Sequence, residues 1–131
     1  MAQDTNLEPE PKQVLALFVF QQGLPWTNRI EESMRAALKI ESDFPITLNV
    51  EHADQSRFPE EAYRSKVIDL YRYKYSKEKM DLVLGVGEEA VGLWFEYGKE
   101  LFGDIPTVFI TTEQFKFPPD RMTPNIECRL G

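Results

Sequence analysis

Short apolar runs alternate with longer amphipathic stretches along most of the chain. Residues 14–20 form an unbroken run of seven apolar residues, rich in Val and Phe. Such a run is typical of a strand buried on both faces. Ile46–His52 instead alternates apolar and polar residues, which indicates a half-exposed strand at the edge of a sheet. Two further apolar runs, Leu82–Val86 and Thr107–Ile110, predict two more buried strands.

The first amphipathic stretch, residues 27–41, predicts a helix that Thr27 or Asn28 caps. Two acidic residues, Glu31 and Glu32, are expected in its first turn, where the helix dipole favours carboxylates. Its apolar residues recur at the spacing of one helical face and are Ile30, Met34 and Leu38.

A second helix is expected to begin near Pro59, a residue that suits the first helical position. Its apolar stripe consists of Tyr63, Val67, Leu70 and Tyr71. A third helix is expected to end at Gly103, since glycine is the usual residue after a helix. Its stripe consists of Ala90, Trp94, Tyr97 and Leu101.

The resulting order, β-α-β-α-β-α-β, predicts an α/β fold with a mostly parallel sheet and helices on both of its faces. Because the second strand alone alternates, we place it at an edge. The predicted strand order is 2-1-3-4, with a fifth strand at residues 125–130, which is the flavodoxin-like, doubly wound, three-layer arrangement. No full helix is predicted after the fourth strand, so the chain is expected to leave this lobe there.

The chain has 131 residues, which suits a single domain. Residues 1–12 are polar, contain Pro9 and Pro11, and are predicted to form a flexible leader. Residues 13–131 then make up the α/β lobe.

Charge and composition narrow the classes of function. The net charge of −7 and the lack of a basic patch argue against nucleic-acid binding. Cys128 and His52 each occur once, which argues against an internal disulfide and a His/Cys metal cluster. No apolar run is long enough for a membrane span and no signal peptide is recognisable. The chain is therefore expected to be either a cytosolic protein or a segment that follows a targeting signal.

Candidate binding residues gather where the predicted strands end. In a doubly wound sheet, ligands bind outside the carboxyl ends of the strands, near the reversal in strand order. Amides, a Trp, carboxylates and hydroxyls there suit a small polar organic ligand. The alternative is that these are ordinary loop residues and that the Trp only covers the core. The candidates are Gln21, Gln22, Trp26, Asp54, Glu88, Thr111 and Thr112.

The segment Gly85–Ala90 matches the G-x-G-x-x-G/A pattern of dinucleotide-binding loops. It follows the third strand instead of the first, and Glu88 and Glu89 occupy the helix start where a pyrophosphate needs positive potential. We therefore do not expect dinucleotide binding.

Catalysis is not predicted. Three acidic doublets, Glu31/Glu32, Glu60/Glu61 and Glu88/Glu89, fall in first turns of predicted helices, where a structural role accounts for them. His52 falls on the apolar face of the second strand, so a packed or rim histidine is expected there instead of a base. We expect no enzyme activity, no cofactor and no metal.

Several segments resemble one family in their order and spacing: Lys12–Leu15, Phe20–Thr27, Arg57–Glu61, Asp81–Val83 and Ile105–Phe109. The family is that of the periplasmic-binding-protein-like sensor domains of bacterial membrane-bound histidine kinases, which are related to the substrate-binding proteins of ABC transporters. The resemblance covers residues 12–130, about the first lobe of a two-lobe domain. The chain departs from the family at Gln21 and Gly87, where the family often has His and Asp.

The resemblance implies an extracytoplasmic ligand-sensing lobe of a two-component receptor in the inner membrane, with a second lobe of the same receptor as its partner. The acidic Glu88 and Asp54 favour a neutral or cationic polar ligand. The alternative is a free-standing cytosolic flavodoxin-like module that binds a nucleotide or a partner protein. An uncovered side of the fourth strand, with Phe109, Phe115 and Phe117, is expected to support a homodimer through residues 105–130.

Overall fold

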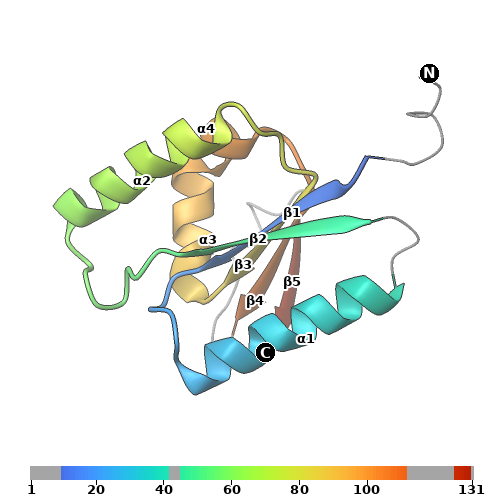
Figure 1. Ribbon diagram of the computed structural model, residues 1–131. Helices are drawn as coiled ribbons and strands as arrows, with labels where there is room; N and C mark the ends of the chain where they lie inside the picture. Colours follow the sequence, from blue (N-terminus) through green and yellow to red (C-terminus); the bar gives the residue numbers. More distant parts are fainter. Residues whose placement is uncertain (1–9, 42–44, 112–125, 131) are drawn as a thin grey trace.

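The computed structural model describes residues 10–41, 45–111 and 126–130 (Figure 1). The strands form one all-parallel sheet in the order β2-β1-β3-β4-β5. The predicted doubly wound, flavodoxin-like arrangement is therefore confirmed. Its strands are β1 (Lys12–Phe18), β2 (Ile46–His52), β3 (Leu82–Val86), β4 (Thr107–Thr111) and β5 (Ile126–Leu130).

Helices cover both faces of the sheet, as Figure 1 shows. Helix α1 (Pro25–Glu41) lies on one face. Helix α2 (Glu61–Tyr75) lies on the other face. Beside α2 runs a continuous helix made of α3 (Glu88–Leu93), the π-helical turn η2 (Trp94–Gly98) and α4 (Lys99–Phe102).

Strand β1 builds both halves of the core, because successive side chains point to opposite faces. Leu15 and Leu17 pack into the half beneath α2 and α4. Ala16 and Phe18 pack into the half beneath α1. All four side chains are buried, and burying a large apolar side chain contributes about 1.5–3 kcal/mol. The unbroken apolar run in the sequence is therefore explained by a central strand with a helical layer on each side.

Helix α1 begins two residues earlier than the sequence suggested. Pro25 occupies its first position, where the missing N–H costs nothing. Thr27 is fully buried inside the helix, and its hydroxyl donates a hydrogen bond to the carbonyl of Leu24 at 2.9 Å. The prediction that Thr27 or Asn28 caps the helix was wrong. As a result, the first turn contains no acidic residue, and Glu31 and Glu32 lie further along.

The third predicted helix ends at Gly103 as expected, but it contains one wide turn. The Trp94 indole lies against Gly98, so any side chain at position 98 would overlap it. The indole stacks on Phe102 with 5.8 Å between ring centroids. The wide turn η2 therefore lies where the large Trp94 side chain packs against the helix itself.

The expectation that Phe109 lies on an uncovered side of β4 was wrong. Phe109 is only 1% exposed, because its ring lies against Gly85 and meets the edge of Trp94. Strand β5 pairs with β4, so β4 is not an edge strand. Phe115 and Phe117 lie outside the described residues, and the predicted homodimer stays a prediction.

Candidate functional site

A crevice of about 330 Å³ opens at the carboxyl ends of β1, β3 and β4. Strand order reverses between β1 and β3, so the crevice lies at the point where doubly wound folds bind ligands. Residues from the strand ends and from the starts of α1 and α3 line it: Phe20, Trp26, Ile30, Val86, Gly87, Glu88, Glu89, Ile110 and Thr111.

Two aromatic rings form one wall of the crevice. Phe20 follows β1, and Trp26 is the second residue of α1. Their ring centroids lie 4.5 Å apart with the planes at 72°, an edge-to-face pair. Trp26 nevertheless remains 43% exposed, although a side chain of this size is usually mostly covered. The indole therefore supplies an aromatic surface that a ligand can reach.

The floor of the crevice depends on a glycine. Gly87 has φ +107° and ψ 152°, a combination that is essentially restricted to glycine. A Cβ there would lie 2.5 Å from Val19 Cγ2 and 2.8 Å from Phe20 Cε2. The N–H of Gly87 also donates a hydrogen bond to the carbonyl of Ile110 at 2.9 Å, which ties β3 to β4 beyond their ladder. Gly87 thus lets the Phe20 ring rest directly on the backbone.

Packing also explains the other glycine of the G-x-G-x-x-A match. A Cβ at Gly85 would lie 2.8 Å from the Phe109 ring and 3.3 Å from Ala90 Cβ. Gly85, Phe109 and Ala90 therefore form a close contact between strand and helix. Both glycines have structural causes that require no bound pyrophosphate.

The crevice has acidic residues at its mouth and aliphatic residues in its interior. Glu88 and Glu89 lie in the first turn of α3 and are exposed. Thr111 is buried, and Ile30, Val86 and Ile110 supply aliphatic surface. The described lining contains neither Lys nor Arg. This composition suits a ligand with an apolar body and no negative charge.

The structure brings together three of the predicted binding residues, Trp26, Glu88 and Thr111. Gln21, Gln22 and Asp54 are not part of the crevice lining. Thr112 lies outside the described residues. The sequence analysis missed the lining residues Phe20, Ile30, Val86, Gly87, Glu89 and Ile110. Most of them lie at strand ends, where mainly polar residues were selected as binding candidates, whereas Ile30 lies within α1 and gave no such signal.

Asp54 instead holds the loop that follows β2. It has φ +56°, a left-handed conformation that Asp tolerates better than most residues. Arg57 donates hydrogen bonds from Nε and Nη2 to its carboxylate, the first at 2.7 Å. The hydrogen bond from Arg57 lowers the pKa of the Asp54 carboxyl below its usual value. An ion-paired residue of this kind has a structural role and little freedom to bind a ligand.

His52 packs as expected. Its ring stacks on Phe18 with centroids 5.0 Å apart, and its Nε2 lies 3.8 Å from the Glu31 carboxylate. Its buried Nδ1 has no hydrogen-bond partner among the described residues. The interpretation of His52 as a packed histidine is confirmed.

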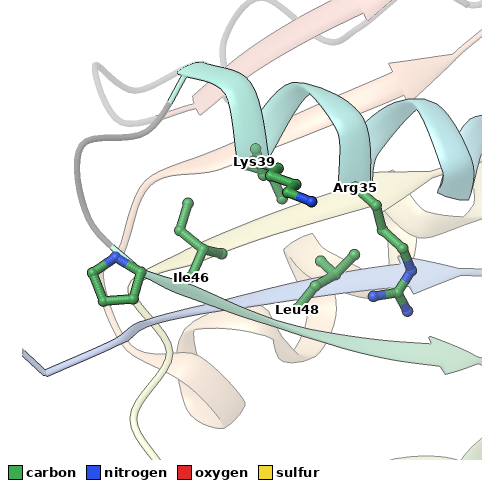
Figure 2. Close-up of a pocket in the computed structure, with 6 residues that line it drawn as sticks. Arg35, Lys39, Ile46 and Leu48 are labelled. Carbon is green, nitrogen blue, oxygen red and sulfur yellow. The ribbon is translucent and has the colours of Figure 1, made fainter.

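A second hollow, also of about 330 Å³, lies between α1 and the edge strand β2. Figure 2 shows Arg35 and Lys39 extending from α1 towards Ile46 and Leu48 of β2. We call this hollow, completed by Leu38 and Pro45, the basic groove. Arg35 pairs with Glu31 at 3.0 Å, one helical turn away.

No protein-family model, curated protein or solved structure matched the chain. Within the described ranges, no group of three or more His, Cys, Asp or Glu side chains is placed to hold a metal ion. None of the described helices is long and apolar enough to cross a membrane.

Proposed function

We propose that this chain is the small-ligand-sensing lobe of an extracytoplasmic receptor, of the kind that controls a membrane-bound histidine kinase. The observation that carries the proposal is the aromatic and acidic crevice at the reversal of strand order. The family resemblance of residues 12–130 supplies the receptor context. In this proposal Trp26, Glu88 and Thr111 contact the ligand.

The proposed mechanism is closure over the ligand. A ligand held against the Trp26 wall contacts a second lobe of the same receptor only when the two lobes close. Its higher affinity for the closed state shifts the equilibrium towards that state, and a hinge transmits the change to the kinase. Nothing in this mechanism requires catalysis in the lobe itself.

The receptor context is tested on the full reading frame that contains this segment. We expect a second α/β lobe, a transmembrane helix and a kinase core. An isolated open reading frame for a single α/β domain would instead favour a cytosolic module that binds a nucleotide or a partner protein.

Ligand binding is tested with a thermal-shift screen of small metabolites, since a ligand that binds only the folded state raises its melting temperature. We expect stabilisation that Trp26→Ala abolishes without loss of the fold. The matched control is Phe58→Ala, because Phe58 is similarly exposed but lies outside the crevice. Stabilisation that survives Trp26→Ala would place the ligand elsewhere.

The binding-only role is tested with esterase, phosphatase and nicotinamide-dependent substrates. We expect no turnover. A rate that Glu88→Gln abolishes while the fold stays intact would contradict the proposal, because it would make Glu88 a general acid or base.

A further inference from the structure

We infer that the crevice selects an organic cation, a quaternary or protonated amine carried on a compact apolar body. This inference rests on the proposed role of the crevice as the ligand site and adds the chemical class of the ligand. It is drawn from three features of one crevice, which are an accessible aromatic wall, two carboxylates and an aliphatic interior.

The aromatic wall supplies the first part of the argument. The face of an aromatic ring carries negative potential, and Trp attracts cations most strongly of the aromatic residues. Phe20 contacts the Trp26 ring and holds it beside the crevice. The Trp26 side chain also stays accessible, at 43% exposure. A charged amine within about 6 Å of this ring would gain attraction that a neutral ligand of the same shape would not.

The carboxylates supply the second part. Glu88 and Glu89 line the same crevice as Trp26, and no described lining residue carries a positive charge. A phosphate or dicarboxylate would therefore meet like charges, and the described lining residues offer no Lys or Arg to compensate them. The net charge of −7 adds a long-range field that attracts cations and repels anions.

The interior supplies the third part. Ile30, Val86 and Ile110 give the crevice an aliphatic lining that gains from burying methyl or methylene groups. A volume of about 330 Å³ lies at the small end of ligand pockets, which suits a metabolite-sized ligand. Together the three parts favour a ligand with a cationic head and a short apolar body.

The test compares three probes of the same shape and different charge by calorimetry on this chain: choline, the neutral 3,3-dimethyl-1-butanol and the anionic 3,3-dimethylbutanoate. We expect choline to bind in the millimolar range, at least tenfold more tightly than the alcohol, and the carboxylate to show no binding. Added salt should weaken the binding of choline but leave the binding of the neutral alcohol unchanged.

Substitutions in the crevice test which side chains contribute to choline binding. Trp26→Leu is expected to weaken choline binding at least tenfold. The double variant Glu88→Gln, Glu89→Gln is expected to weaken choline binding about tenfold and to leave binding of the alcohol unchanged. The matched control is the pair Glu60→Gln and Glu61→Gln, which neutralises an acidic doublet at the start of α2, outside the crevice lining. Unfolding curves confirm that each variant is folded.

The outcomes separate this inference from the proposed function. Equal affinity for choline and the alcohol, unchanged by the glutamine variants, would overturn the cation inference while leaving the crevice as a ligand site. Absence of choline binding would also overturn it. Choline binding that Trp26→Leu leaves intact would also overturn the inference, because the aromatic wall would then contribute nothing to cation binding.

Discussion

The two ends of helix α1 contribute to two hollows of equal size and opposite charge. Near its start, Trp26 and Ile30 line the crevice, together with Glu88 and Glu89. Near its end, Arg35 and Lys39 line the basic groove. Each hollow has a volume of about 330 Å³, so size alone does not distinguish a ligand site from a surface groove.

The difference lies in how each hollow is built. The crevice collects residues from the ends of three strands and the starts of two helices, so separate chemical groups converge on one point. The basic groove comes from one helix and one edge strand, with the loop residue before that strand. Its cations lie beside an edge strand, where Lys and other charges oppose unwanted strand pairing. Convergence of several elements, more than volume, therefore marks the better candidate for recognition.

The largest expected loss of stability comes from a substitution in the floor of the crevice, at Gly87. Gly87→Ala should lower the free energy of unfolding by about 3 kcal/mol or more, because it adds backbone strain and a clash with Val19 and Phe20. Gly23→Ala is the control: Gly23 also has positive φ, but no atom lies within 4 Å of its added Cβ, so about 1 kcal/mol is expected. Urea unfolding measures both. Equal losses would show that the contact with Phe20 is unimportant.

A smaller effect is expected where α1 begins beside the crevice. Thr27→Val keeps the buried shape but removes the hydrogen bond to the Leu24 carbonyl. The free energy of unfolding should fall by about 1 kcal/mol. Thr47→Val, on the exposed side of β2, is the matched control and should change stability by less than about 0.5 kcal/mol. The Asn28 N–H also donates a hydrogen bond to the Leu24 carbonyl, at 2.9 Å, so a neutral Thr27→Val would mean that this bond alone satisfies the carbonyl.

A pH-dependent effect is expected at the loop after β2, outside both hollows. Because Arg57 lowers the folded-state pKa of Asp54, their pairing stabilises the fold fully above the unfolded-state pKa. The stabilisation is lost as the pH falls through the folded-state pKa. Arg57→Gln should therefore lower the stability only slightly at pH 7, since the pair is exposed to solvent, and the stability of the variant should converge with that of the parent protein in acid. Denaturation at several pH values measures this, and a pH-independent difference would contradict it.

The smallest effect is expected in the basic groove. The pair Arg35→Gln and Lys39→Gln removes both cations, including the exposed Arg35–Glu31 ion pair. Exposed helical pairs contribute only about 0.3–0.5 kcal/mol, so stability should hardly change. Choline affinity in the crevice should also stay within twofold. A large gain or loss of choline affinity would show that the two hollows are electrostatically coupled.

The sequence alone predicted the elements and their order well. Residues 14–18 of β1 are all apolar because both faces of the strand are buried there, and β2 alternates because it lies at the edge of the sheet. Helix starts were predicted less well. A buried Thr27 resembles a cap in sequence, and only packing shows that its hydroxyl faces back into the first turn of α1.

The position of the crevice was predicted from the sequence, and its lining residues only in part. Chain order and strand burial determine where parallel strands end, so the location of the crevice followed from the sequence pattern. Whether Asp54 faces a ligand or pairs with Arg57, and whether Phe20 or Gln21 lines the crevice, was decided by the tertiary structure. The physical reason is that periodicity reports which residues are buried, whereas side-chain partners depend on distances between segments far apart in the chain.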